Sequence, residues 1–582
     1  MRFIGLVAVL ALLFPQNQNT FSNEPAAKPV ADFILKDTAG RKVSLLDFKD
    51  KKATVVIFIG TQCPINNAYM PRLVELDKTF GPQGVQFLAI NSNDHDSAET
   101  IKAHAKKHGL PFPVLRDEGH VAADRLGARR TPEAIVLDGR RVIHYQGRID
   151  DQFGIGYQRP QPKRHDLAEA IKEGLAGKKV TQATTPVEGC LIARAPRPRE
   201  SAAVTYSNQV ARILQNKCQE CHRPGQIGPM PLLSYEDSSS WAAMIREVVK
   251  SKRMPPWHAD PAHGKFLNDR SLSKADSDTL LTWIENGCPK GDDKDMPEAK
   301  KFTDGWNIGK PDAVFTMPRE FTVPAKSKGG VRYQYFVVPT NFEDDVWIQA
   351  AEAKPGNRAV VHHIIVYVAK DRKRMSSAGD GLGAGFLVAY APGDLGVGFP
   401  LGAAKKIPKG ANLVFQMHYT PNGFEQSDRS SVGLIFAKKP PEHEVRTRGI
   451  AQRFFVIPPG AKSHKVTSST TFTQDAMLWS LLPHMHLRGR SFSYQAVFPD
   501  GKTQILLSVP QYDFNWQSNY RLEKPLHMPA GTKIECTATF DNSTGNANNP
   551  DPTRWVIWGD QTWEEMMIGF VDYTYLADAD KK

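Results

Sequence analysis

Three different hydrophobic patterns follow one another along the chain, and each requires a fold class that the others exclude. From about Ala31 to Lys178, apolar runs such as "ATVVIFIG" and "VQFLAINS" alternate with helical patterns, which predicts α/β structure built from βαβ units. Residues 205–292 carry mainly helical patterns. From about Asp304 onward, short alternating segments such as "VHHIIVYV" are separated by Pro, Gly and Asn turns, which predicts all-β structure.

A chain of 582 residues is too long for one hydrophobic core, so we predict a multidomain protein. The patterns place a signal peptide or anchor at 1–22, an α/β domain at 28–180, a linker at 181–204, a helical domain at 205–300, and β-sandwich domains at 304–445 and 446–582. The stretch "IARAPRPRE" indicates the linker because it is rich in Pro and Arg and has no period.

The N-terminus is typical of an export signal. Phe3 to Phe14 is an uncharged apolar run behind Arg2, too short to span a bilayer comfortably. We therefore expect a periplasmic or extracellular protein; cleavage near residue 20 and retention as a membrane anchor both stay open. The net charge of +12 comes without a run of Lys or Arg, which argues against a nucleic-acid partner.

The helical region contains "CQECH", residues Cys218 to His222. Cys-x-x-Cys-His is the attachment signature of c-type haem, so Cys218 and Cys221 are the predicted thioether positions and His222 the predicted iron ligand. Met254 in "KRMPPWHAD" is the expected sixth ligand, with His258 and Met230 as alternatives. The stretch "LLTWIENGCPKGD" resembles the closing helix of a small cytochrome c, which implies a small all-α cytochrome c domain with one haem.

The β-rich region carries histidines in strand-like segments without a cysteine beside them. Imidazole and thioether ligands together favour copper, because zinc rarely binds Met. Adjacent histidines point to opposite faces of a regular strand, so His362 and His363 need a bulge to share a metal, whereas His484 and His486 in "LLPHMHLRG" point to one face. The candidate ligands are His362, His363, His418, His484, His486 and Met566.

The order His-His, Gln-x-His-Tyr, His-x-His and Glu-Met resembles the copper type II, ascorbate-dependent monooxygenases, the family of peptidylglycine α-hydroxylating and dopamine β-monooxygenases, from about Trp306 to Tyr573. The resemblance implies two jelly-roll-like sandwiches with one copper each. His362, His363 and His418 would hold the electron-accepting copper, and His484, His486 and Met566 the copper where O2 hydroxylates a C–H bond of a small organic substrate. An external donor would supply the electrons.

Departures from that family leave the substrate unknown. Leu482 stands where the peptide-amidating enzymes carry a substrate-binding Arg, and Phe570 stands where they carry a Tyr. Their disulfides are missing too, because Cys536 is the only cysteine of the region. Five structural histidines, or a copper protein that binds the metal without catalysis, are the alternative interpretations.

Cys63 follows an apolar strand and precedes Pro64, which suits the first position of a helix whose dipole lowers a thiol pKa. With Pro132 before another strand, residues 28 to 180 resemble the redoxin and peroxiredoxin-like branch of the thioredoxin superfamily. Asn66 replaces the second cysteine of the usual pair. Cys63 is therefore a predicted one-cysteine nucleophile, a partner of Cys190, or part of a domain kept for docking.

The sequence thus predicts an exported monooxygenase with two coppers and one haem c. Its rivals are an electron-transfer or copper-redox protein without substrate turnover, and a thiol peroxidase or reductase centred on Cys63.

Overall fold

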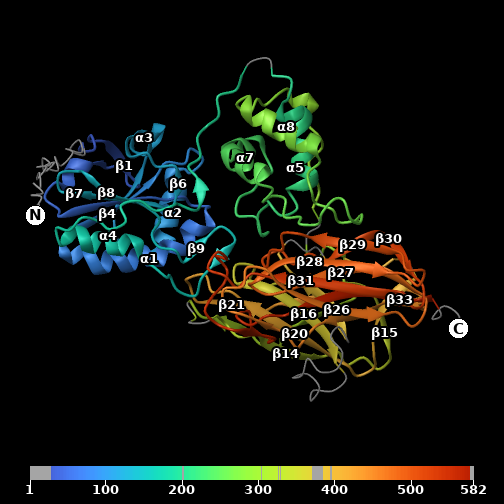
Figure 1. Ribbon diagram of the computed structural model, residues 1–582. Coiled ribbons are helices and arrows are strands. Elements are labelled where there is room, and N and C mark those ends of the chain that lie inside the picture. Colours follow the sequence, from blue (N-terminus) through green and yellow to red (C-terminus); the bar gives the residue numbers. More distant parts are fainter. Residues whose placement is uncertain are drawn as a thin grey trace, which may run out of the picture.

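The computed structural model describes residues 28–199, 202–302, 305–325, 327, 330–369, 385–392, 396–400 and 402–576, arranged as a thioredoxin-like unit, a helical unit and two β-sandwich units (Figure 1). The predicted signal or anchor at 1–22 lies outside these residues. Within them, no helix has both the length and the apolar character needed to cross a membrane.

The thioredoxin-like unit is built on a seven-stranded sheet in the order β2-β1-β5-β4-β3-β7-β8. The central strands β3, β4 and β5 are parallel, and β7 and β8 run antiparallel at one side. The strands are β1 (Ile34–Asp37), β2 (Lys42–Ser44), β3 (Ala53–Phe58), β4 (Val85–Asn91), β5 (Val114–Arg116), β7 (Glu133–Asp138) and β8 (Ile143–Gly147). Its helices are α1 (Pro64–Phe80), α2 (Ala98–His108), α3 (Val121–Leu126) and α4 (Asp166–Leu175).

Both faces of this sheet are covered, as the nearly continuous apolar strand β3 requires. Val55 and Ile57 pack with α1, α2 and α4 on one face, and Val56 and Phe58 pack with α3 on the other. The predicted α/β domain is therefore confirmed.

The predicted linker 181–204 is not entirely a linker. Within it, strand β11 (Cys190–Leu191) pairs antiparallel with strand β6 (Arg130–Thr131) of the thioredoxin-like unit. Thr131 precedes Pro132 through a cis peptide bond. Because β11 returns to this point, Cys190 lies beside the strand that precedes the cis-proline.

The helical unit contains one π-helical turn (Tyr206–Val210) and the helices α5 (Ala211–Lys217), α6 (Tyr235–Ser240), α7 (Ala242–Lys250) and α8 (Lys274–Glu285). Trp283 of α8 is fully buried at the centre of its core and donates Nε1–H to Pro289 O (3.1 Å). The helical character of this region is as predicted, and its assignment as a cytochrome c domain stays a prediction.

The first β-sandwich places two sheets around one core. One sheet has the path β12-β22-β15-β19-β23 with β18 beside β15, and the other has the order β14-β20-β16-β17. Their strands are β12 (Ala313–Thr316), β14 (Gln334–Pro339), β15 (Val346–Lys354), β16 (Val361–Ala369), β17 (Phe386–Tyr390), β18 (Val397–Gly398), β19 (Ala403–Ile407), β20 (Asn412–Tyr419), β22 (Ser431–Phe436) and β23 (His443–Glu444); β13 (Phe321–Val323) pairs with β21 (Gln426–Asp428).

The second β-sandwich has the same layered plan around its own core. One sheet has the order β24-β33-β27-β30 and the other β26-β31-β28-β29. Their strands are β24 (Arg446–Ala451), β26 (His464–Thr471), β27 (Ala476–His484), β28 (Gly489–Val497), β29 (Thr503–Val509), β30 (Tyr520–Met528), β31 (Lys533–Phe540) and β33 (Ile568–Tyr575); β25 (Val456–Ile457) pairs with β32 (Val556–Ile557).

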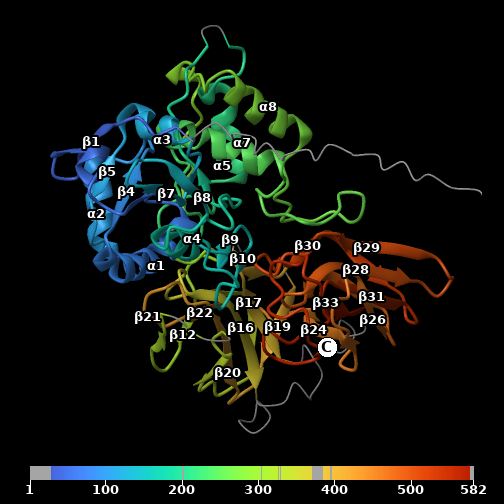
Figure 2. The same cartoon turned by 60° about the vertical axis from the view of Figure 1, so that its left-hand side comes forward.

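The helical unit lies over the β-sandwiches and beside the thioredoxin-like unit in both views (Figures 1 and 2). On one side, Arg130 forms an ion pair with Glu247 of α7 (2.6 Å). On the other, Trp257 packs edge-on against Tyr520 of the second sandwich, with ring centroids 4.9 Å apart. The two sandwiches meet through β17 and β33, where the Phe386 and Phe570 rings lie 5.5 Å apart.

Candidate functional site

Cys63 lies between strand β3 and helix α1, with Pro64 at the first helical position as predicted. Its Sγ donates to Thr131 O (3.1 Å), and the main-chain N–H of Cys190 donates to Cys63 Sγ (3.4 Å). The structure therefore brings together two cysteines that are 127 positions apart in the sequence. Asn66, which stands at the second position of the motif, is fully buried and donates instead to Gly60 O (2.7 Å).

The environment of Cys63 favours its thiolate. Burial raises the pKa of this thiol, but hydrogen bonds from the Cys190 thiol, the Asn66 N–H and the Cys190 N–H outweigh burial and lower the pKa to about 7. The pKa of Cys190 moves the other way, because its thiol donates to Cys63 and is itself partly shielded from solvent. The Cys63 thiol is thus ionised more readily than the Cys190 thiol.

Cys63 packs against strand β11. The Cys63 side chain is only 1% exposed, and the Cys190 N–H of this two-residue strand contacts its Sγ. Gly189 permits this close approach, because a Cβ at that position would lie 2.1 Å from Thr131 O and the residue has φ of +148°.

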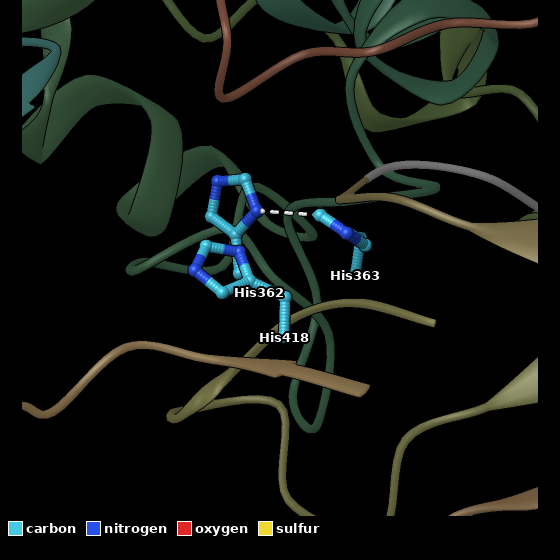
Figure 3. Close-up of side chains that lie close together, drawn as sticks. All are labelled: His362, His363 and His418. Carbon is cyan, nitrogen blue, oxygen red and sulfur yellow. Dashed lines mark hydrogen bonds between the residues drawn. The ribbon is translucent and has the colours of Figure 1, made fainter. Parts of the chain in front are cut away.

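The first predicted metal triad is assembled (Figure 3). His363 and His418 face one another across β16 and β20, and the register of this pair is irregular between Val361 and His363. This is the bulge that the adjacent histidines require. One ring nitrogen from each of His362, His363 and His418 lies within 4.8 Å of the others.

These nitrogens are suited to a cation. His362 Nε2, His363 Nε2 and His418 Nδ1 are buried without a hydrogen-bond partner. Burial lowers the pKa of His362 to about 4, and burial together with the neighbouring imidazoles lowers the pKa of His363 and His418 well below 6.5. Neutral imidazoles with ring nitrogens that have no other partner are what a metal site needs, so these residues fit copper.

The second predicted pair lies at the end of β27. Strand β27 ends at His484, so the strand is shorter than predicted and His486 lies beyond its end. The ring centroids of His484 and His486 are nevertheless 5.3 Å apart. His484 Nδ1 contacts Gln517 Oε1 (2.6 Å) and His486 Nδ1 contacts Glu564 O (3.2 Å). His486 Nε2 is buried without a partner.

Met566 stands just before the strand that pairs with β27. His484 pairs with Ile568, and Leu482 pairs with Phe570. The ladder ends at the His484–Ile568 pair, so Met566 and His486 both lie just beyond it. Met566 is buried and packs in one cluster with Ile568, Phe570 and Leu482.

The two sets of histidines face one another across the interface between the sandwiches. The rings of His363 and His484 have centroids 6.5 Å apart. A cavity of about 890 Å³ reaches the first set, with His362, His418 and Phe514 among its lining residues and Tyr157 of the thioredoxin-like unit in its wall. The cavity therefore gives a small molecule access to His362 and His418 of the first set.

Sequence reasoning missed the buried polar residues that support the second pair. Glu565 is fully buried, accepts from the main-chain N–H groups of His486 (2.9 Å) and Arg488 (2.6 Å), and has its pKa raised by burial to about 8. Arg488 is also buried and donates to Asn542 Oδ1 (2.9 Å). The only sequence signal was that Glu565 stands directly before the predicted ligand Met566.

The predicted haem motif lies after α5. His222 Nδ1 contacts Met230 O (3.1 Å), which fixes that nitrogen as the donor and leaves Nε2 as the atom free to bind iron. Burial raises the pKa of Cys218 to about 12, and Cys218 and Cys221 are not bonded to each other. These residues fit thioether attachment. Met254 follows α7 and its N–H donates to Val248 O (3.2 Å); its role as a ligand stays a prediction.

A cavity of about 340 Å³ separates this motif from the sandwiches. Cys221 lines one side of it. Lys405, Leu482 and Asp572 line the other. Leu482 is two residues before His484 in β27, so the cavity that Cys221 lines also reaches the strand that carries His484.

The AhpC/TSA family profile matches residues 26–151. The thiol-disulfide oxidoreductase ResA of Halalkalibacterium halodurans is 28% identical over 157 residues, which are 26% of this chain and 88% of that protein. The chloroplastic peroxiredoxin Q of Sedum lineare is 33% identical over 147 residues, which are 24% of this chain and 72% of that protein.

Among solved structures, the hypothetical protein SMc02350 from Sinorhizobium meliloti 1021 shares 32% identity with a TM-score of 0.26, covering 28% of this chain and 92% of its own. Each of these likenesses covers less than a third of the chain.

Proposed function

We propose that this chain, which belongs to the AhpC/TSA family through residues 26–151, carries out thiol–disulfide exchange. Cys63 is the nucleophile and Cys190 is its resolving partner. The thioredoxin-like unit is a redox domain of the thiol-disulfide oxidoreductase and peroxiredoxin kind. The observation that carries the finer proposal is the 3.4 Å contact from Cys190 N–H to Cys63 Sγ.

The exchange has two steps. The Cys63 thiolate attacks one sulfur of a substrate disulfide, breaks the S–S bond, releases one substrate thiolate and forms a mixed disulfide. Cys190 then attacks Cys63 Sγ, releases the second substrate thiolate and leaves a Cys63–Cys190 disulfide. Two electrons pass to the substrate, and its two thiolates take up one proton from solution and one from Cys190. The reverse sequence oxidises a substrate dithiol.

Peptide mapping under non-reducing conditions tests this proposal. Reduced protein treated with oxidised glutathione should yield a Cys63–Cys190 cross-linked peptide that is two hydrogens lighter than its reduced parts. Cys190→Ser should stop at the mixed disulfide on Cys63. Cys536→Ser is the matched control, because that buried thiol lies in the second sandwich, and it should form the cross-link normally. Oxidised wild-type protein without the cross-link would remove Cys190 from the mechanism.

A second candidate function is favoured by the unpartnered imidazole nitrogens of His362, His363 and His418. We infer that this triad and the group His484, His486 and Met566 each hold one copper. Bound copper would supply one-electron redox chemistry and, with O2, C–H hydroxylation of a small organic substrate. The surrounding residues keep the imidazoles neutral, orient their rings and shield them from water.

The haem motif would supply electrons singly to such a site. Cys218 and Cys221 would anchor the porphyrin, and the Met230 carbonyl would orient the His222 ring for the iron. A pyridine haemochrome spectrum of protein made in a host that attaches haem c tests this assignment. Folded protein without covalent haem would contradict it.

Metal analysis of purified protein tests the copper proposal. We expect about two coppers per chain, one fewer in His363→Ala and one fewer in His484→Ala, with the haem spectrum unchanged in both. Oxygen uptake with ascorbate then distinguishes turnover from metal storage. Unchanged copper content in both variants would show that the histidines are structural.

A further inference from the structure

The loop 511–519, between strands β29 and β30 of the second sandwich, reaches the histidines of both triads. Neither its sequence "QYDFNWQSN" nor its position among the strands suggests a metal ligand. Its interior residues Phe514 and Gln517 are nevertheless 7% and 8% exposed, whereas Gln511 at its start is exposed.

Gln517 fixes the ring of His484. The Gln517 Nε2 group donates to Phe514 O (3.1 Å), so its Oε1 is the atom that faces His484 Nδ1 at 2.6 Å. An amide oxygen can only accept a hydrogen bond, and therefore His484 carries its proton on Nδ1. The lone pair of His484 then lies on Nε2, which is the atom left for a metal.

Tyr512 holds the main chain between the two histidines of this pair. Its hydroxyl accepts from Met485 N–H (3.0 Å) and donates to Met485 O (2.8 Å). Both bonds go to the residue between His484 and His486, so the loop fixes the spacing of the two imidazoles as well as the tautomer of one.

Phe514 of the same loop contacts the first triad. Its ring stacks on His362 with centroids 4.7 Å apart and planes at 14°. The Phe514 centroid is also 6.0 Å from that of His418 and 6.3 Å from that of His486. One aromatic side chain thus contacts imidazoles from both sets.

We propose that the loop 511–519 is a positioning element shared by the two metal sites, with Gln517 orienting His484 and Phe514 orienting His362. This inference rests on the proposed copper function. The loop also donates from Asn515 Nδ2 to Gly156 O of the thioredoxin-like unit (3.0 Å), so its position is fixed from a third side.

Copper titration of the full chain against a competing chelator, followed by EPR of bound Cu(II), tests the proposal. Gln517→Leu removes the acceptor of His484 Nδ1 and should weaken one of the two coppers by roughly 10–100-fold while the other keeps its affinity and spectrum. The retained copper shows that the variant has folded. Gln517→Glu keeps an acceptor oxygen and should restore tight binding.

Phe514→Leu should change the EPR signal of the copper at His362, His363 and His418. Gln511→Leu is the matched control, since it places the same residue at an exposed position of the same loop, and it should leave both coppers unchanged. Wild-type protein that binds no copper would overturn the copper function and this inference with it. A different outcome would overturn the loop's role alone. In that outcome the wild type binds two coppers, and Gln517→Leu and Phe514→Leu both match Gln511→Leu in copper affinity and EPR signal.

Discussion

Replacing Gly189 by alanine should separate Cys190 from Cys63 and raise the pKa of the Cys63 thiol. The new Cβ would lie 2.1 Å from Thr131 O and 2.9 Å from Thr131 C, so β11 must move outward by more than about 1 Å to reach a normal contact. The hydrogen bond from Cys190 N–H, already 3.4 Å long, is then lost.

The size of the effect follows from the bonds that hold the thiolate. The pKa of Cys63 is about 7 with these bonds, against 9.0 for an ordinary thiol, and burial alone raises it further. A rise of two pKa units is about 2.7 kcal/mol of lost thiolate stabilisation. At pH 7 the thiolate fraction would fall from about one half to about 1%, so we expect a roughly 50-fold slower attack on a substrate disulfide.

Thiolate absorbance at 240 nm, titrated against pH in reduced protein, measures this pKa directly. The contribution of Cys63 is the difference between each protein and its Cys63→Ser counterpart. Gly177→Ala is the control, because Gly177 also has a positive φ (+67°) but a Cβ there meets nothing within 4 Å. If Gly189→Ala and Gly177→Ala both titrate as the wild type does, the approach of β11 does not set the pKa of Cys63.

Three further outcomes follow from burial. Burial lowers the pKa of His104 and His108 to about 4. The free energy of unfolding that these neutral histidines contribute should therefore be complete above about pH 6.5 and fall by up to about 3 kcal/mol each as the pH drops towards 4. The double variant His104→Asn, His108→Asn should make the melting temperature less dependent on pH over that range. Trp283→Ala should destabilise the helical unit by about 3–5 kcal/mol in urea unfolding, because the side chain is fully buried, whereas exposed Trp555→Ala should cost little. Burial raises the pKa of Cys288 to about 12 and that of Cys536 well above 9, so iodoacetamide at pH 8 should modify neither in folded protein and both in urea, as read by mass spectrometry.

The side chains of the candidate metal sites could be named from the sequence, because strand periodicity and imidazole chemistry are both local. The bulge near His362 followed from the same reasoning, since adjacent strand residues cannot otherwise share a ligand. The end of β27 at His484 was missed, because the apolar and polar pattern continues past the last ladder hydrogen bond.

Contacts between distant segments could not be predicted in this way. Pairing with Cys190 was one of three interpretations of Cys63 that the sequence left open, and the pairing of β11 with β6 is what brings the two residues together. Gln517 and Phe514 lie in a loop whose residues carry no period and no ligand signature. The contact of Gln517 with His484 depends on how the loop folds back onto β27, and that of Phe514 with His362 depends on how the two sandwiches meet. No short stretch of sequence encodes either.

The helical unit packs against Cys190 and Leu191 of β11 and shares a cavity with Leu482 of β27, and this bears on how the proposed redox groups would work together. Thiol–disulfide exchange transfers two electrons at once, whereas copper and haem each accept one electron at a time. Arg130 is adjacent to Thr131, which contacts Cys63, and it forms an ion pair with Glu247 of α7. Cys221 of the haem motif and Leu482 line the same cavity. Under the proposed function, the helical unit would supply single electrons to the copper-binding histidines, and its contacts with β11 and with Arg130 would hold it beside the thiol pair.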